Sequence, residues 1–247
     1  MIIHAAGLAH RVAKNTIDEE NFFKSNVLGT KNLLDGLGKS FIPKHFVFIS
    51  SVSVYGLTEG INISEEAPLL AQDPYGLSKI EAELLIKKWC IENNVICTIL
   101  RLPLLVGADP KGNLSSLIHS IKKGFYFQIS NVNPQKSMIL LRDVHCFIIK
   151  AYQIGGIYNL TDGFHPSIDE LSLSIALHFK KRNLPKLPYW IAKCAALLGD
   201  IIGDKFPINS LKLKKLKSSL TFDDSRAREA IEWSSNSVVK NISQSLK

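Results

Sequence analysis

The 247-residue sequence lacks any pair of closely spaced cysteines. Its four cysteines are scattered along the chain, and none forms the C-x-x-C motif that is typical of structural zinc sites and dithiol redox sites. Each lies in an apolar stretch, where a free thiol behaves as a small hydrophobic side chain. The four are Cys90, Cys97, Cys146 and Cys194. This cysteine usage favours a reducing, cytoplasmic setting.

Patterns typical of metal binding and nucleic-acid binding are missing too. The seven histidines form no pair with zinc-like spacing, and no carboxylate cluster accompanies them, so no metal site is expected. The formal net charge is +8, but its basic residues are spread out, and the one dense run, LKLKKLKSS at 211–219, is typical of a solvated helix face. Without a basic stripe bearing exposed aromatic residues, nucleic acid is not an expected partner. A phosphate-bearing small molecule would satisfy the charge equally well.

No apolar run reaches the ~20 residues that a membrane-spanning helix needs. The longest, LPYWIAKCAALLGDIIG from Leu187 to Gly203, carries Lys193 and Asp200. We interpret it as a buried or interfacial helix. The N-terminus shows no basic segment followed by a long apolar run, so no secretory signal is expected.

Hydrophobic residues make up 46% of the chain, which is enough to bury a large core. Short β-branched runs alternate with helical patterns over the first 156 residues, and this alternation predicts a parallel sheet with right-handed crossovers, an α/β fold. Strands are expected within 1–7, 44–56, 95–102 and 137–141, and helices over 17–39, 73–94, 114–123 and 143–152.

The pattern becomes mostly helical and more basic after about Gly156. We therefore predict an α/β domain over 1–156 and a smaller lobe over 157–247, with contributions to that lobe from about 104–140. In open α/β sheets the ligand lies at the carboxyl ends of the strands. The informative residues should then follow the strands, at 4–7, 50–53 and 103–107.

The stretch DPYGLSKIEAE at 73–83 carries a candidate reaction centre. Asp73 as N-cap and Pro74 at the first position predict the start of a helix, which places Tyr75 and Lys79 on one face, one turn apart. An ammonium near a phenol stabilises the phenolate, which makes tyrosine a workable acid or base. Two surface side chains can share this spacing by chance. The hydroxyl of Ser51, at the end of a strand beside this helix, favours the chemical interpretation.

Seven short motifs occur in the order found in a known enzyme family. They are HAAG at 4–7, NVLGT at 26–30, SSVSVYG at 50–56, YGLSK at 75–79, LRLPLLVG at 100–107, GNL at 112–114 and LRDV at 141–144. On these motifs the chain resembles the extended short-chain dehydrogenase/reductases, the NAD-dependent epimerase/dehydratase group that acts on nucleotide sugars. The resemblance implies a Rossmann-like parallel sheet with a small, mostly helical substrate lobe.

A finer likeness rests on HAAGLAHRV at 4–12, DPKGNLSSL at 109–117 and the pattern of the lobe. These stretches are similar to bacterial surface-polysaccharide enzymes that reduce or epimerise C4 of UDP-linked 2-acetamido sugars. The implied activity is NAD(P)-dependent oxidoreduction at C4 of a UDP-hexose, as an epimerase or a 4-ketoreductase. A homodimer is compatible with the resemblance.

The resemblance also assigns catalytic roles. It implies that Tyr75 is the acid or base, and that Lys79 binds the nicotinamide ribose of NAD or NADP and lowers the pKa of the tyrosine. Ser51 would hydrogen-bond the C4 oxygen of the sugar. Asn26 would hold the helix and the water that complete the proton path.

Further positions correspond to cofactor and substrate contacts in the family. Small residues after the first strand would let the backbone approach the pyrophosphate, and residues after the third would line the nicotinamide pocket. The implied cofactor contacts are Ala5, Ala6, Gly7, Ser50, Tyr75, Lys79 and Pro103. The implied substrate contacts are Ser51, Leu104, Asn113 and Lys136, the last at a position where many relatives have an arginine. Asn113 and Lys136 can equally be ordinary surface residues.

The sequence departs from the family in one respect. Members begin with a strand, a glycine-rich turn of the G-x-x-G-x-x-G type and a helix that receives the pyrophosphate, and no such glycine cluster occurs here. We therefore expect weak or no dinucleotide binding by the chain as written, and an open edge on the Met1–Ala5 strand. Either the chain starts late, or it is a degenerate, non-catalytic relative, or another chain supplies the missing strands.

Overall fold

The computed structural model describes residues 1–9, 13, 15–110, 112–203 and 208–246. The motif stretches at 4–12 and 109–117 therefore lie partly outside the described residues. The strands are β1 (Ile2–His4), β2 (His45–Ser51), β3 (Gly60–Ile63), β4 (Ile96–Leu102), β5 (Leu104–Val106), β6 (Gln128–Ile129), β7 (Met138–Leu140), β8 (Gly156–Asn159), β9 (Lys186–Leu187) and β10 (Leu220–Phe222). The α-helices are α1 (Thr16–Phe22), α2 (Gly29–Ser40), α3 (Pro74–Glu92), α4 (Asn113–Lys123), α5 (Leu141–Ala151), α6 (Ile168–His178), α7 (Tyr189–Ile202), α8 (Ser210–Lys217), α9 (Ser225–Ile231) and α10 (Val238–Ser245). A π-helix, η1 (Phe23–Leu28), joins α1 to α2, and a 3-10 helix, η2 (Val52–Tyr55), follows β2.

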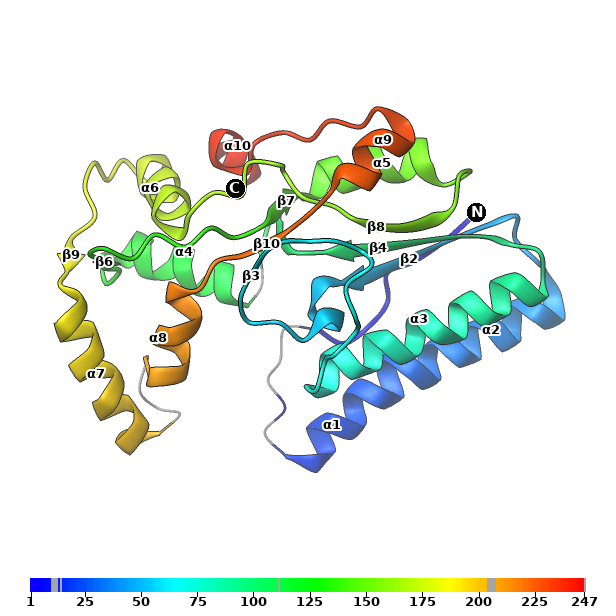
Figure 1. The fold of residues 1–247 in the computed structure, drawn as a ribbon, viewed down its shortest axis with the longest axis horizontal. Helices are drawn as coiled ribbons and strands as arrows, with labels where there is room; N and C mark the ends of the chain where they lie inside the picture. Colours follow the sequence, from blue (N-terminus) through cyan, green and yellow to red (C-terminus); the bar gives the residue numbers. More distant parts are fainter. Residues whose placement is uncertain (10–12, 14, 111, 204–207, 247) are drawn as a thin grey trace.

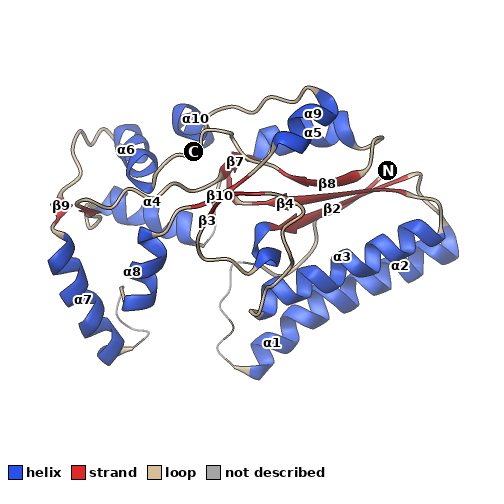
Figure 2. Ribbon diagram, viewed as in Figure 1, coloured by secondary structure: helices blue, strands red, loops and turns tan. Residues whose placement is uncertain are grey.

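A four-stranded parallel sheet in the order β1-β2-β4-β8 lies at the centre of the molecule (Figure 2). Helical segments connect its successive strands, as parallel pairing requires. The predicted α/β class with a parallel sheet is confirmed. Two details differ from the prediction. The run at 137–141 forms β7, which pairs with β5 outside the central sheet, and the fourth strand is β8, which was not predicted.

Helices cover both faces of the sheet, α2 and α3 below it and α5 and α9 above it in Figure 1. The period-2 alternation of β2 explains this arrangement, because successive side chains of a strand point to opposite faces. Phe46 and Phe48 pack in one cluster with Leu34 of α2 and Ile86 of α3. Val47, between the two phenylalanines, packs in another cluster, with Phe147 of α5.

The edge of the sheet at β1 is open in the part of the chain that the structure describes. There β1 pairs with β2 alone, and Ile3 is 46% exposed. This geometry agrees with the open edge expected from the sequence. An exposed strand edge carries unpaired backbone groups that can accept a further strand.

A second core lies beyond the sheet, where α4, α6 and α10 pack around β5 and β7. The chain then returns to the sheet, where Ala227 of α9 and Trp233 pack in the cluster that contains Val47. The division at residue 156 coincides with the start of β8, and the assignment of 1–156 and 157–247 to two units stays a prediction.

The apolar segment that begins at Leu187 forms β9 and α7, and α7 packs against α8. A small cluster joins them through Ala192, Ala196 and Leu213. Within the described residues, no helix has the combination of length and apolar character that crossing a membrane requires.

Candidate functional site

The carboxyl ends of the strands meet at one edge of the sheet. The register pairs His4 with Phe48 and Ser51 with Leu102. Residues 5–7 and 50–51 therefore reach the same edge, together with Pro103, directly after β4. This edge is the ligand side of an open α/β sheet.

Tyr75 stands at the start of α3, beside this edge. The helix begins there because the Asp73 carboxylate accepts a hydrogen bond from Gly76 N (Oδ1 to N, 3.0 Å) and Pro74 occupies the first turn. The Tyr75 ring is half-buried and lies 6.0 Å from the Phe22 ring, centroid to centroid. Its phenol lies close enough to the side chain of Ser51 for hydrogen bonding to act on its pKa. The phenol and the hydroxyl predicted to work together are thus brought into contact.

Burial raises the pKa of Tyr75, the hydrogen bond with Ser51 opposes that shift, and the Asp73 carboxylate adds to it. The resemblance implied a pKa lowered by Lys79, so the direction found in the structure is the opposite. The reason is burial, which is the largest cause of the shift, while the ammonium of Lys79 donates to the carbonyl oxygen of Ile49 in β2.

Lys79 is buried, with 6% of its surface exposed, one turn after Tyr75. Its Nζ donates a hydrogen bond to the carbonyl oxygen of Ile49 (2.9 Å) and lies 4.7 Å from the centroid of the Phe48 ring. Burial lowers the pKa of Lys79 to about 8, and the carboxylate of Glu83 opposes this shift. The lysine is therefore partly neutral near physiological pH.

The depressed pKa of Lys79 predicts how stability depends on pH. An unfolded lysine keeps its proton up to a pH of about 10.4. Between pH 8 and 10 the unfolded chain therefore binds more protons than the native one, and stability rises with pH by up to about 1.4 kcal/mol per pH unit. Urea unfolding of the wild type and of Lys79→Met at pH 7, 8, 9 and 10 isolates this contribution. The free energy of unfolding of the wild type should gain on that of the variant above pH 8, and a constant difference would contradict the assignment.

Asn26 lies in the π-helix η1 and is 2% exposed. Its amide Nδ2 donates to Leu8 O (3.1 Å) and to Ser78 Oγ (2.8 Å), while Oδ1 accepts from Leu8 N (2.6 Å). Ser78 Oγ in turn donates to the carbonyl oxygen of Tyr75 (2.8 Å). Asn26 therefore ties the segment after β1 to the first turn of α3. Single π-turns of this kind are frequent at functional sites.

Gly7 lies beside Asn26 and Lys79 at a position where a side chain does not fit. A Cβ on Gly7 would lie 2.9 Å from Asn26 Oδ1 and 3.5 Å from Lys79 Nζ. The amide of Asn26 is held by three hydrogen bonds and has little freedom to move aside. Ala5, Ala6 and Gly7 are all exposed, so this small-residue segment is open to a ligand on its outer side.

A buried ionic network lies behind the reaction-centre candidates. The Arg101 guanidinium binds the Glu83 carboxylate with two hydrogen bonds, Nε to Oε1 at 3.1 Å and Nη2 to Oε2 at 2.8 Å. Glu83 is fully buried and also accepts from Ser50 Oγ (2.6 Å). The hydroxyl of Ser50, an implied cofactor contact, is thus engaged by Glu83. Tyr55 extends the network, since its hydroxyl accepts from Arg101 Nη1 (3.1 Å) and donates to Asn159 Oδ1 (2.8 Å).

The two glutamates of the segment SKIEAE, Glu81 and Glu83, differ in burial. Glu81 is exposed, as expected, but Glu83 has no exposed surface. The spacing of Glu83 could have predicted its burial, because positions 75, 79 and 83 lie one turn apart on one face of the helix. Because this face packs Tyr75 and Lys79 against the sheet, Glu83 on the same face is buried as well.

The remaining implied contacts are more dispersed. Leu104 is half-buried and packs toward the second core, and Asn113 is exposed at the first position of α4. Lys136 Nζ donates to the carbonyl oxygen of Lys215 in α8 (3.3 Å), and burial, with Lys215, lowers its pKa. Among the described residues, neither Asn113 nor Lys136 forms a hydrogen bond with Tyr75, and their roles as substrate contacts stay predictions.

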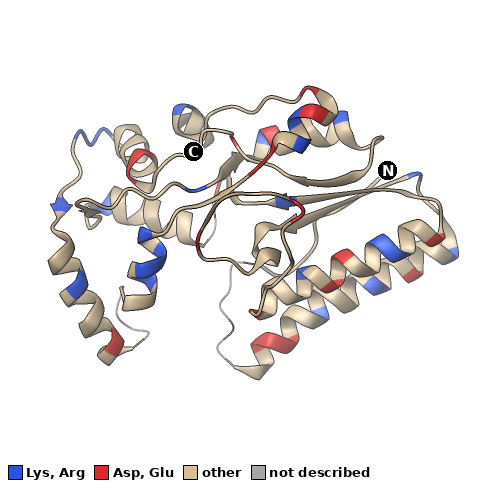
Figure 3. Cartoon of the chain, viewed as in Figure 1, with Lys and Arg blue, Asp and Glu red and all other residues tan. Residues whose placement is uncertain are grey.

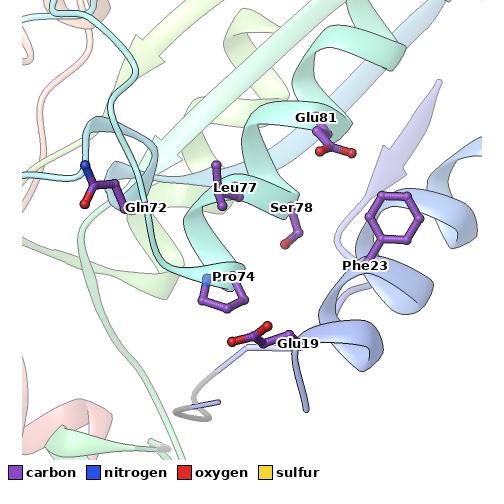
Figure 4. Close-up of a pocket in the computed structure, with 7 residues that line it drawn as sticks. All are labelled: Glu19, Phe23, Gln72, Pro74, Leu77, Ser78 and Glu81. Atoms are coloured by element: carbon purple, nitrogen blue, oxygen red, sulfur yellow. The ribbon is translucent and has the colours of Figure 1, made fainter. Parts of the chain in front are cut away.

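A shallow pocket of about 290 Å³ lies between α1–η1 and the start of α3 (Figure 4). It is lined by Glu19, Phe23, Gln72, Pro74, Leu77, Ser78 and Glu81. Tyr75, Lys79 and Ser51 are not part of its lining, so we assign it no role in the chemistry. Among the described residues, no group of three histidine, cysteine, aspartate or glutamate side chains could hold a metal ion, and the four cysteines are free thiols.

The chain matches a protein-family model and several curated proteins. The model describes the NAD dependent epimerase/dehydratase family and matches residues 1–160. The chain is 28% identical over 221 residues to the N-acetyl-alpha-D-glucosaminyl-diphospho-ditrans,octacis-undecaprenol 4-epimerase of Escherichia coli O157:H7, covering 85% of this chain and 66% of that protein. It is 26% identical over 243 residues to the UDP-glucose 4-epimerase of Vibrio cholerae, covering 94% of this chain and 71% of that protein. The chain thus spans about two thirds of the length of these relatives.

Solved structures show the same fold. RMD from Pseudomonas aeruginosa complexed with NADPH superposes with a TM-score of 0.75 at 21% identity, covering 98% of this chain and 78% of that one. The UDP-glucose 4-epimerase of Thermotoga maritima with UDP-glucose gives a TM-score of 0.75 at 18% identity, covering 98% and 74%. At these identities the likeness concerns the fold.

Proposed function

Because the chain belongs to the NAD-dependent epimerase/dehydratase family, we propose that it carries out NAD(P)-dependent oxidoreduction at C4 of a UDP-hexose. The observation that carries the proposal is the placement of the Tyr75 phenol beside the Ser51 side chain at the strand edge, with buried Lys79 one helical turn further on. Curated relatives of the chain include epimerases and a reductase that act on nucleotide-linked or lipid-diphosphate-linked sugars.

The residues at the strand edge fit the nicotinamide end of a dinucleotide. The absence of a side chain at Gly7 keeps space beside Asn26 and Lys79, which a Cβ would fill. The Lys79 ammonium has three N–H donors and gives one to Ile49, so donors remain for ribose hydroxyls. Ala5, Ala6 and Gly7 would bring the backbone close to the cofactor. When bound, NAD or NADP supplies the acceptor and donor of the hydride at C4.

In the proposed reaction, side chains of this protein transfer the proton. Oxidation of the C4 alcohol removes a hydride from carbon and a proton from oxygen, and Tyr75 takes this proton as phenolate or returns it as phenol. Ser51, whose side chain lies beside the phenol, holds the sugar oxygen next to it. We assign to Lys79, one helical turn from Tyr75, the role of favouring the phenolate form once sugar and dinucleotide are bound.

A UDP-hexose, possibly carrying a 2-acetamido group, is our proposed substrate, with surface polysaccharide biosynthesis as its context. The support is twofold: the finer sequence likeness at 4–12 and 109–117, and the names of relatives that act at C4. Epimerase and 4-ketoreductase use the same groups. They differ in whether the 4-keto sugar is reduced again in place or leaves.

An isotope experiment tests the proposal and separates the two reactions. The protein is incubated with NAD⁺ or NADP⁺ and with UDP-glucose, or UDP-N-acetylglucosamine, that carries deuterium at C4. An epimerase yields the C4 epimer with the deuterium still at C4. Transfer of the deuterium into the reduced dinucleotide, with release of the keto sugar, indicates the oxidoreductase instead.

The competing interpretation is a non-catalytic relative that no longer binds the dinucleotide. The absence of a glycine-rich turn from the 247 residues favours it. If the folded protein converts none of the labelled sugars and does not change NADH fluorescence on titration, the catalytic proposal fails for this chain.

A further inference from the structure

Two of the four cysteines meet where α3 packs on the central sheet. Cys90 lies in the last turn of α3 and is buried, and Cys97 is the second residue of β4 and is half-buried. Both belong to the cluster that contains Phe46 and Ile86, Cys90 as a buried member and Cys97 packed against it. The pair lies where β4 begins, so it is at the edge of the sheet opposite to the candidate site.

The connection between α3 and β4 explains why the two thiols meet. Where the helix ends, the backbone N of Val95 donates to the carbonyl oxygen of Cys90 (2.8 Å), and the chain turns back into β4. Successive side chains of a strand point to opposite faces. Cys97 shares with Ile99 the face that packs on α3, whereas Leu100 packs in the cluster on the other face. The side chain of Cys97 is therefore turned toward the helix that carries Cys90.

The two thiols act on each other. They lie close enough for hydrogen bonding between them to raise the pKa of Cys90, with burial as a further cause, and to lower the pKa of Cys97. The ammonium of Lys87 also lowers the pKa of Cys97, while burial and the Glu83 carboxylate oppose this shift. Basic and acidic residues alternate along α3 (Figure 3), and Lys87 is the basic one that acts on Cys97. Negative charge is thus favoured on the half-buried sulfur, while the buried one keeps its proton.

We propose that Cys90 and Cys97 are a redox-sensitive pair, which hydrogen peroxide converts into a reversible disulfide within one chain. A redox-sensing site combines a reachable thiol of thiolate character with a second thiol beside it that resolves the oxidised form. Cys97 meets the first requirement and Cys90 the second. Disulfides of reducing compartments are usually of this transient kind, so the inference agrees with the setting expected from the sequence. It goes beyond the proposed function and does not depend on it.

The oxidation takes place in two steps. The Cys97 thiolate attacks one oxygen of hydrogen peroxide, so that an S–O bond forms, the O–O bond breaks and hydroxide leaves; Cys97 is then a sulfenic acid. The Cys90 sulfur attacks the sulfur of this sulfenic acid, so that the S–S bond forms, the S–O bond breaks, and the hydroxyl leaves with the Cys90 proton as water. The two thiols together give up two electrons, which reduce one peroxide to two waters. A dithiol reductant reverses the change.

Thiol counting tests the proposal on a chain that keeps only this pair. The variant Cys146→Ser/Cys194→Ser removes the two exposed thiols. The folded protein is treated with a small excess of hydrogen peroxide, the peroxide is removed, and the chain is unfolded in urea and labelled with maleimide. We expect neither thiol to be labelled, the intact monomer to have lost the mass of two hydrogen atoms, and dithiothreitol to restore both thiols. Digestion of the oxidised wild type without reductant should yield a peptide linked through Cys90 and Cys97.

Two further variants on the same background separate the roles of the thiols. With Cys90→Ser, oxidation should stop at a sulfenic acid on Cys97, which dimedone captures. With Cys97→Ser, the buried Cys90 should lose its thiol at least ~10-fold more slowly than Cys97 does. Circular dichroism confirms that each variant is folded.

Three results would overturn the proposal. In the first, both thiols are still labelled after peroxide treatment of the folded protein, although the same treatment oxidises the urea-unfolded chain. In the second, the disulfide forms only between two chains and gives a dimer on a non-reducing gel. In the third, the two single-cysteine variants are oxidised at equal rates, because Cys97 would then have no special reactivity.

Discussion

Replacement of Tyr75 by phenylalanine is expected to lower turnover of the proposed C4 oxidoreduction at least ~100-fold, the usual scale of an acid or base contribution. The variant removes the hydroxyl that lies beside Ser51 and leaves the ring against Phe22. The fold should therefore persist while the proton path is lost. Turnover is measured with the C4-labelled sugar nucleotide and NAD⁺, alongside circular dichroism to confirm folding.

Tyr152→Phe is a matched control for this variant. Tyr152 follows α5, and its hydroxyl accepts a hydrogen bond from Gln153 Nε2 (2.7 Å) at an exposed position. The same chemical change there should leave turnover near the wild-type value. If Tyr75→Phe also retains near-normal turnover, Tyr75 is not the acid or base, and the proposed mechanism fails even where the fold is intact.

Removal of Arg101 is expected to cost about 3–5 kcal/mol of unfolding free energy, because it leaves a buried carboxylate without its partner. Arg101 is 2% exposed and Glu83 is fully buried, so water cannot replace the lost bonds without opening the core. Arg101 also donates to Tyr55 and to the carbonyl oxygen of Glu65, and both acceptors would lose a donor. Urea unfolding of Arg101→Ala measures the loss.

The exposed pair Lys88–Glu92 offers the matched control. Its Nζ and Oε1 lie 3.9 Å apart, with side chains 76% and 58% exposed. Lys88→Ala should change stability by less than about 1 kcal/mol, since exposed pairs contribute little. The double variant Glu83→Leu/Arg101→Met should be more stable than Arg101→Ala, because no unpaired charge remains. If Arg101→Ala costs no more than Lys88→Ala, the network has no role in stability.

Much of the candidate site could be predicted from short stretches of sequence. The start of α3 was predicted from Asp73 and Pro74, and the structure has the helix over Pro74–Glu92 with Asp73 as its cap. The proximity of Tyr75 to Ser51 followed from the rule that strand ends and helix starts meet at one sheet edge. Signals of this kind extend over a few residues and need no knowledge of the rest of the chain.

Other features depended on contacts between distant segments. The strand β8 was missed because the run that begins at Gly156 is only four residues long, and such a run becomes a strand through its pairing with β4. The direction of the Tyr75 pKa was missed because it depends on how deeply the ring is buried. Asn26 bonds to Ser78, 52 positions away, and that contact exists only once η1 packs on α3.

The sequence by itself determined the α/β alternation, the start of the helix that Asp73 caps, and the position of Tyr75 and Lys79 on one face of it, because periodicity and capping act within one or two turns of chain. Only the tertiary structure decided that Glu83 is buried against Arg101 and that the Lys79 ammonium turns to Ile49. Each of these depends on which surface packs against the residue, and burial sets both the pKa values and the energies of the ion pairs.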